Sequence, residues 1–222
     1  MFIKVCGTTC EDDALLAVAL GADAVGFVFA PSPRQIAPQI AGDIAKRLPP
    51  EIVTVGVFQD EPPERVLSIA HVAGLRAVQL HGHEPARTAQ WLSTRVPMVI
   101  QAFAAGDARV LRAAEYDAHV ILLDAPHPGS GKVFDWSLAA EVPAGQRLMI
   151  AGGLTSDNVA AAIARARPWG VDAVSGLERE PGRKDPIKMR EFIAAARAAG
   201  SELDGPERDD DAAPVYDWQA EP

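Results

Sequence analysis

The chain has few cysteines and no long apolar segment, and each shortage excludes a class of protein. Two cysteines, Cys6 and Cys10, occur among its 222 residues. A pair so close together makes no disulfide framework, so we expect a reducing, cytoplasmic setting. No apolar run approaches the roughly 18 residues that a membrane span requires, so no membrane partner is expected. Residues 1–5 also lack the pattern of a secretory signal peptide.

Basic residues are also fewer than acidic residues. The net charge is −9, from 21 basic and 30 acidic residues, and this sign disfavours nucleic acid as a partner. Residues 201–222 hold eight acidic residues and one arginine, a net charge of −7. Subtracting −7 from −9 leaves −2 for residues 1–200, which are therefore nearly neutral. We expect one folded domain at 1–200, followed by a disordered acidic tail at 201–222.

Short apolar runs alternate with helical stretches through the first 200 residues. Strands are predicted at 2–6, 24–29, 52–58, 77–80, 98–103, 120–124, 148–151 and 172–175. Helices are predicted at 11–20, 38–48, 62–73, 85–94, 107–116, from Asp135, at 156–166 with Thr155 or Ser156 as N-cap, and at 186–199. Strict alternation predicts parallel strands, and eight units match an α/β fold of the (β/α)₈ TIM-barrel type. The main alternative is a doubly wound open sheet, although no Gly-x-Gly-x-x-Gly follows the first strand.

The most informative segment is 119–136. A continuous apolar run ends there on Asp124, and a loop rich in glycine and proline follows at 126–133. This pattern predicts a buried parallel strand that delivers one carboxylic acid to the mouth of a loop able to close over a site. The alternative is that Asp124 only caps a turn.

On a barrel the carboxyl ends of all strands meet at one rim. The residues predicted there are Cys6, Arg34, His81, Asp124, the pair Gly152-Gly153 and the pair Ser175-Gly176. The glycine pairs suit a phosphate, because backbone N–H groups approach the anion closely. Arg34 offers a fork of donors for a carboxylate or a phosphate.

Two of these candidates have plainer alternatives. Cys6 could be a small buried hydrophobe, but with Asp124 across the rim it could form a base–acid pair. To act as a base, the thiol needs a depressed pKa, for which a nearby cation is one source. His81 and His83 form a His-x-His pair that could suggest a metal ligand set, but no third ligand in register is evident.

Several collinear segments carry a family resemblance. They are Lys4-Val-Cys6-Gly7, residues 21–29 with Ser32-Pro-Arg34, Val55–Phe58, Val78–Gly82, Leu123-Asp124, Gly129–Trp136, Ala151–Leu154 and Ser175–Glu178 with Pro181-Gly182 and Lys184-Asp185. Over residues 2–197 the chain resembles the phosphoribosylanthranilate isomerases of tryptophan biosynthesis. The resemblance implies a (β/α)₈ barrel that converts N-(5-phosphoribosyl)anthranilate by an Amadori rearrangement.

The resemblance also implies roles for particular residues. Asp124 would be the general acid and Cys6 the base, Arg34 would hold the anthranilate carboxylate, and His81 would line the site. The phosphate would lie among Gly152, Gly153, Ser175 and Gly176, with Asp172 as a further substrate-binding residue. No metal and no cofactor is expected, because the substrate's own imine serves as the electron sink. The partner is a small-molecule phosphosugar, and the chain is expected to be a monomer or a homodimer.

Some features depart from the family, and alternatives remain. Val174 stands where the family usually places a serine, and His127 has no assigned place. The acidic tail is outside the family pattern. Rival functions are a metal-dependent phosphosugar epimerase, a sugar-phosphate isomerase with two carboxylates, and a barrel that only binds its ligand.

Overall fold

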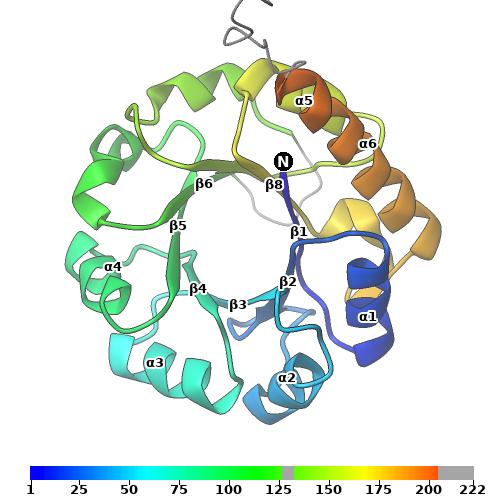
Figure 1. Cartoon of the computed structure of the whole chain (residues 1–222). Helices are drawn as coiled ribbons and strands as arrows, with labels where there is room; N and C mark the ends of the chain where they lie inside the picture. Colours follow the sequence, from blue (N-terminus) through cyan, green and yellow to red (C-terminus); the bar gives the residue numbers. More distant parts are fainter. Residues whose placement is uncertain (127–132, 205–222) are drawn as a thin grey trace, which may run out of the picture.

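Eight parallel strands close into a barrel in the computed structural model, which describes residues 1–126 and 133–204 (Figure 1). The strands are β1 (Phe2–Val5), β2 (Ala24–Val28), β3 (Val53–Phe58), β4 (Ala77–Leu80), β5 (Met98–Ala104), β6 (Val120–Asp124), β7 (Leu148–Ile150) and β8 (Gly170–Ala173). They lie in sequence order, and β1 pairs with β8 through Lys4 and Asp172 to close the ring. The (β/α)₈ prediction is therefore confirmed, and the open-sheet alternative is wrong.

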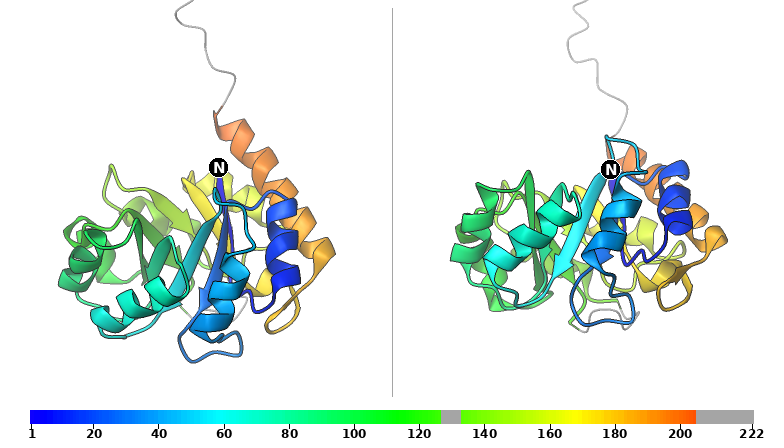
Figure 2. Two further views of the ribbon diagram at one scale, coloured as in Figure 1. Left: turned by 60° about the horizontal axis from the view of Figure 1, so that its bottom comes forward. Right: turned by 90° about the horizontal axis from the view of Figure 1, so that it is seen from below.

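Helices surround the barrel, as the two side views show (Figure 2). The α-helices are α1 (Glu11–Ala19), α2 (Pro38–Ala45), α3 (Pro63–Val72), α4 (Ala86–Ser93), α5 (Val159–Ala166) and α6 (Pro186–Asp204). In the described part of the chain the 3₁₀ helices are η1 (Ala108–Tyr116), η2 (Trp136–Glu141) and η3 (Ser175–Leu177). A small antiparallel hairpin follows η3, made of β9 (Glu178–Glu180) and β10 (Arg183–Lys184). None of the described helices is both long and apolar enough to cross a membrane.

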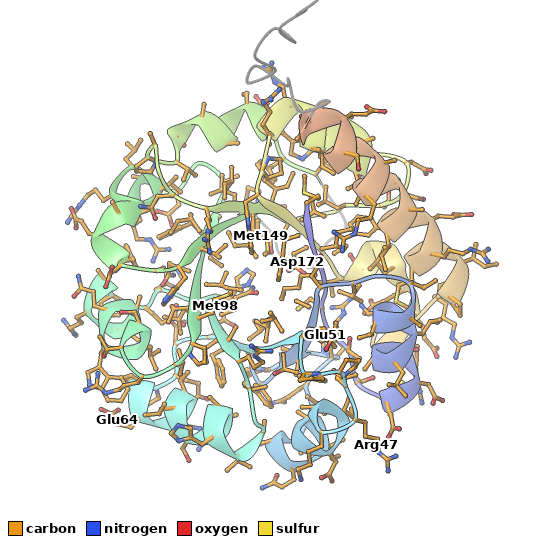
Figure 3. The ribbon with its side chains drawn as sticks, viewed as in Figure 1. Arg47, Glu51, Glu64, Met98, Met149 and Asp172 are labelled. Carbon is orange, nitrogen blue, oxygen red and sulfur yellow. The ribbon has the colours of Figure 1, made fainter. Side chains whose placement is uncertain are left out.

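Side chains alternate between two buried layers. Along β1, Ile3 and Val5 belong to the large layer that packs against the helices, whereas Phe2 packs against the smaller layer inside the barrel. Met98 and Met149 lie at this inner layer together with alanine, valine and leucine side chains (Figure 3). The Phe2 ring stacks on Trp169 with 4.4 Å between ring centroids and closes the amino-terminal end of the barrel. The inner layer is thus a packed core beneath an open rim.

Several predicted elements differ in detail. In place of the helix predicted at 107–116 the structure has η1, two short 3₁₀ stretches joined by a kink at Arg112, and its buried residues Val110, Ala113 and Tyr116 recur every third position. The segment from Asp135 is also a 3₁₀ helix, with the Asp135 carboxylate accepting the Ser137 N–H at 2.9 Å. The last strand ends at Ala173, because Ser175 already belongs to η3.

The helix predicted at 156–166 begins later, at Val159, and neither Thr155 nor Ser156 caps it. Asn158 explains the delay. Its side chain accepts the Thr155 N–H and donates to the Gly153 carbonyl, both at 2.9 Å, and so holds the preceding residues in a turn.

Two sequence predictions fall largely outside the described residues. Most of the glycine-rich loop at 126–133 lies in the gap at 127–132. Helix α6 continues past residue 200 to Asp204, and the remainder of the predicted tail, 205–222, is likewise outside. The boundary between domain and tail therefore stays a prediction.

Candidate active site

A pocket of about 360 Å³ opens where the strands end, and all nine predicted site residues line it. They are Cys6, Arg34, His81, Asp124, Gly152, Gly153, Asp172, Ser175 and Gly176. They come from six strands and from the loops that follow them, so the barrel brings together side chains that are far apart in the sequence. Their individual roles stay predictions.

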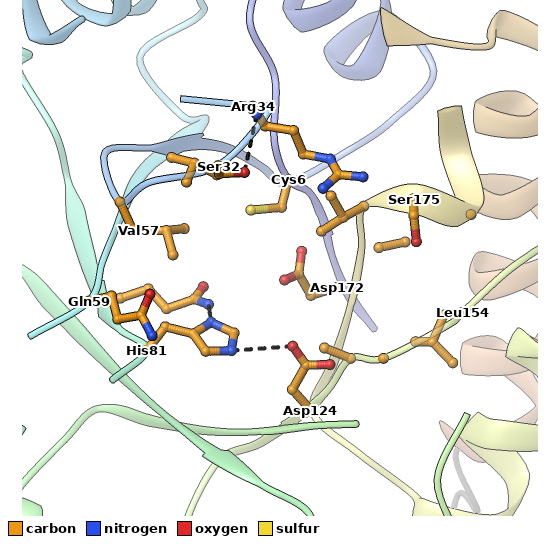
Figure 4. Close-up of a pocket in the computed structure, with 18 of the residues that line it drawn as sticks. Cys6, Ser32, Arg34, Val57, Gln59, His81, Asp124, Leu154, Asp172 and Ser175 are labelled. Atoms are coloured by element: carbon orange, nitrogen blue, oxygen red, sulfur yellow. Dashed lines mark hydrogen bonds and ion pairs between the residues drawn. The ribbon is translucent and has the colours of Figure 1, made fainter. Parts of the chain in front are cut away.

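Cys6 and Asp124 enter this pocket from opposite sides (Figure 4). Cys6 follows β1 and is 3% exposed, while Asp124 is the last residue of β6 and is 7% exposed. Gly26 on β2 leaves the room that the sulfur occupies, because a Cβ there would lie 2.5 Å from Cys6 Sγ. The thiol and the carboxyl therefore face one small cavity from two sides.

A buried ion pair lies next to the thiol. Lys4 Nζ is 2.9 Å from Asp172 Oδ2, and both side chains are almost fully buried. The second carboxylate oxygen, Asp172 Oδ1, has no hydrogen-bond partner among the described residues, and Asp172 lines the pocket. An unpaired buried acceptor favours a ligand that donates, such as a sugar hydroxyl.

The electrostatic balance at Cys6 differs from the expectation of a depressed pKa. Burial raises the pKa of the Cys6 thiol, and the nearby Lys4 ammonium opposes this rise without cancelling it. Burial alone would lower the pKa of Lys4, but Asp172 and Cys6 outweigh it and hold that pKa above its usual value. The cation expected from the sequence is present, yet the dry surroundings of the sulfur have the larger effect.

Asp124 ends a chain of three polar side chains. Gln79 Nε2 lies 2.8 Å from His81 Nδ1, and His81 Nε2 lies 3.3 Å from Asp124 Oδ2 (Figure 4). The Ala125 N–H donates to Asp124 Oδ1 at 2.7 Å. If the Gln79 amide nitrogen donates to Nδ1, the imidazole carries its proton on Nε2 and directs it at Asp124.

The two histidines of the His-x-His pair point to different places. His81 lines the pocket, whereas the His83 side chain is 83% exposed and lies 3.7 Å from Asp60. The pair therefore does not converge on one point as two ligands of a metal ion would.

The glycine residues after β7 and β8 shape one wall of the pocket. Gly152 and Gly153 have positive φ angles of 82° and 63°, and a Cβ on Gly152 would lie 2.9 Å from Asp124 Oδ1. Because α5 begins only at Val159, the turn that contains Gly152 and Gly153, rather than the first turn of the helix, would meet an anion. Within the described residues, their N–H groups donate to no backbone carbonyl, which suits an oxyanion ligand.

Arg34 is not a solvated loop arginine, because its side chain is 13% exposed and paired with Glu178. Its Nε and Nη2 donate to the two oxygens of Glu178 at 2.8 and 2.7 Å, and this bond raises the pKa of Arg34. Burial alone would raise the pKa of Glu178, but Arg34 and Lys184 outweigh it and hold that pKa low. Burial also lowers the pKa of Lys184.

Sequence reasoning gave no role to Lys4, Gln79, Glu178 and Lys184. A signal for Lys4 was available: a lysine within an apolar strand, in phase with Phe2 and Cys6, must face the barrel interior. Glu178 and Lys184 follow β8, the last strand of the barrel, in the region where the loops of a barrel reach its rim. Their sequence pattern does not reveal which residues they contact.

The fold and the pocket define a (β/α)₈-barrel enzyme with its site at the carboxyl ends of the strands. Residues 3–195 match the family described as N-(5'-phosphoribosyl)anthranilate (PRA) isomerase. The isomerase of Desulforudis audaxviator is 48% identical over 89% of this chain and 98% of its own length. The crystal structure of the Thermus thermophilus enzyme matches with a TM-score of 0.84 and 41% identity, over 89% of this chain and 99% of that one.

A second crystal structure, of a phosphoribosylanthranilate isomerase in complex with reduced 1-(o-carboxyphenylamino)-1-deoxyribulose 5-phosphate, matches with a TM-score of 0.79 and 41% identity. It covers 89% of this chain and 99% of that one. The chain belongs to the N-(5'-phosphoribosyl)anthranilate isomerase family and is an isomerase of tryptophan biosynthesis. The predicted family is therefore confirmed.

Proposed function

We propose that the chain converts N-(5-phosphoribosyl)anthranilate to 1-(2-carboxyphenylamino)-1-deoxyribulose 5-phosphate, with Asp124 as general acid and Cys6 as general base. The observation that carries this proposal is the placement of these two groups on opposite sides of one pocket. Family membership supplies the reaction, and the geometry supplies the candidates for its first two proton transfers.

The first step opens the furanose ring. Protonated Asp124 donates its proton to the ring oxygen, and the bond from C1 to that oxygen breaks. The lone pair of the anthranilate nitrogen forms a C1–N double bond, which leaves a protonated imine and a hydroxyl on C4. His81 Nε2, 3.3 Å from Asp124 Oδ2, lies where it can donate a hydrogen bond to the carboxylate that this transfer leaves.

The second step moves a proton from carbon. The Cys6 thiolate removes the proton on C2, and the C2–H electrons form a C1–C2 double bond while the imine nitrogen becomes neutral. The resulting enol loses its hydroxyl proton and gains one at C1, which yields the ketone. No atom is gained or lost overall, and the imine accepts the electrons within the substrate itself.

The remaining residues bind and orient the substrate. The turn at Gly152 and Gly153, with Ser175 and Gly176, receives the phosphate. The free oxygen of Asp172 accepts a sugar hydroxyl. Arg34 contacts the anthranilate carboxylate, since a guanidinium can bind a carboxylate through two parallel hydrogen bonds.

The proposal is tested by adding purified protein to freshly prepared N-(5-phosphoribosyl)anthranilate and following the decay of its fluorescence. We expect decay that is faster than the spontaneous loss of substrate and proportional to enzyme concentration. Decay at the spontaneous rate, with folded protein present at high concentration, would refute the proposed function.

A further inference from the structure

The contact between Arg34 and Glu178 uses only one edge of the guanidinium. Glu178 accepts hydrogen bonds from Nε and from one hydrogen of Nη2. An arginine has five N–H donors, so three remain, two on Nη1 and one on Nη2. One hydrogen of Nη1 and the remaining hydrogen of Nη2 form a second fork at the outer edge of the group. Since Arg34 lines the pocket, this second fork is the part of the side chain available to a ligand.

Glu178 is itself fixed by contacts on several sides. Its side chain is 4% exposed, and Lys184 Nζ and the Gly182 N–H each approach Oε1 at 3.3 Å. The same Lys184 ammonium donates to the Cys6 carbonyl at 2.6 Å and to the Val174 carbonyl at 3.1 Å. The hairpin of β9 and β10 is thereby tied to the ends of β1 and β8. Glu178 thus presents its carboxylate to Arg34 from a rigid support.

The backbone near Arg34 is also adapted to this arrangement. Gly7 has a φ of 71°, and a Cβ there would lie 2.7 Å from Arg34 Cδ, so the arginine stem lies across a residue that must be glycine. The Arg34 N–H donates to Ser32 Oγ at 3.1 Å, which holds the loop from which the side chain starts.

We propose that Glu178 is a positioning residue that directs the free fork of Arg34 toward the anthranilate carboxylate and so sets the preference for a carboxylated substrate. This inference rests on the proposed function. A long arginine side chain loses considerable rotamer freedom when it is fixed, and a contact formed in advance removes that loss from the binding step. Glu178 therefore raises affinity for a ligand that it does not touch.

The test compares two inert ligands. One is reduced 1-(2-carboxyphenylamino)-1-deoxyribulose 5-phosphate, and the other is its counterpart without the carboxylate on the ring. Dissociation constants are measured by titration calorimetry for the wild-type chain, Glu178→Gln and Glu178→Asp. The second variant keeps a negative charge beside Lys184 while withdrawing the carboxylate from Arg34, so it carries the test if Glu178→Gln does not fold.

We expect each variant to weaken binding of the carboxylated ligand about 10-fold, the change for one displaced charge-assisted contact, and to leave the other ligand within about 2-fold. In an Arg34→Ala background, Glu178→Gln should have no further effect, because the fork that it directs is gone. Asp107→Asn is the matched control. Asp107 also binds an arginine, Arg109, through two hydrogen bonds at 2.9 and 2.6 Å. This variant should leave the affinities for both ligands unchanged.

Two results would overturn the inference. One is equal affinity of wild type and both variants for the carboxylated ligand. The other is an equal loss for both ligands, which would assign Glu178 a structural or phosphate-directed role. A wild-type chain that binds neither ligand would instead refute the proposed function, and the inference that rests on it.

Discussion

The Lys4 ammonium lies 2.9 Å from the Asp172 carboxylate, inside the barrel and one inward-facing position below the Cys6 thiol. Charges of opposite sign buried this deeply are tolerated only as a pair, because each alone would be costly to remove from water. The pair therefore affects both the stability of the barrel and the charge next to the sulfur.

Breaking this pair on one side is expected to destabilise the fold. Lys4→Met leaves a buried carboxylate without its partner, and we expect a loss of about 3–5 kcal/mol in the free energy of unfolding. Lys46→Met removes an exposed partner of Asp43, with both side chains about three-quarters exposed, and should cost less than about 1 kcal/mol. Urea unfolding of each variant measures its change in the free energy of unfolding. A Lys4→Met/Asp172→Leu chain should recover stability but not activity.

Removing either proposed catalytic group should abolish most activity while the protein stays folded. We expect Cys6→Ala and Asp124→Ala each to lower kcat by about 10²- to 10⁴-fold, the usual contribution of a positioned acid or base. Cys10→Ala removes the other thiol, which precedes α1 outside the pocket, and should leave kcat unchanged. Steady-state assays with circular dichroism decide this; full activity in either variant would exclude its assigned role.

The raised pKa of Cys6 predicts the pH at which its thiolate forms. The pKa of Cys6 lies above its ordinary value of 9.0, so the thiol should still be mostly protonated at about pH 9, and below its pKa the thiolate fraction should increase about tenfold per pH unit. The part of the ultraviolet thiolate absorbance that Cys6→Ala lacks should rise accordingly. A Cys6 thiolate signal that is already complete at about pH 7 would contradict the raised pKa.

Gly26 is predicted to matter because of the space beside the sulfur. In Gly26→Ala the new methyl group would collide with Cys6 Sγ, and a displacement of the base by about 1 Å can lower the rate about 100-fold. We expect kcat to fall with a smaller change in KM. Crystallography of the variant would reveal the displaced sulfur, and wild-type kcat would show that the thiol has room to move.

Arg34 should act on binding more than on chemistry. Arg34→Ala removes a charged contact worth about 2–3 kcal/mol, so KM should rise about 30- to 150-fold. Arg112→Ala is the control. Arg112 pairs with Glu115, is 72% exposed and does not line the pocket, so its removal should leave KM unchanged. An unchanged KM in the first variant would remove Arg34 from the substrate-binding residues.

Strand ends were predictable from the sequence, and with them the position of the candidate site. Buried parallel strands read as continuous apolar runs, so the residues that end them, such as Cys6 and Asp124, could be assigned to one rim once eight units were counted. The helix details were less predictable, because the turn that the Asn158 side chain holds before α5 and the 3₁₀ form of η1 depend on small local differences in energy.

The supporting residues could not be predicted for another reason. Lys4 meets Asp172 across 168 positions and Lys184 meets the Cys6 carbonyl across 178. No local pattern encodes contacts over such separations; they exist only after the ring has closed. For the same reason, the paired state of Arg34 was hidden until the hairpin that carries Glu178 had been placed.

The pairing of β1 with β8 has a consequence for the chain during its synthesis. The thiol is made before seven of the eight barrel strands, whereas the cations and carboxylates around it include residues from β8 and from the hairpin after it. An emerging polypeptide therefore carries an ordinary cysteine until β8 and the hairpin have left the ribosome. The reactive environment of that sulfur arises only when the two termini of the barrel join, so incomplete chains lack it.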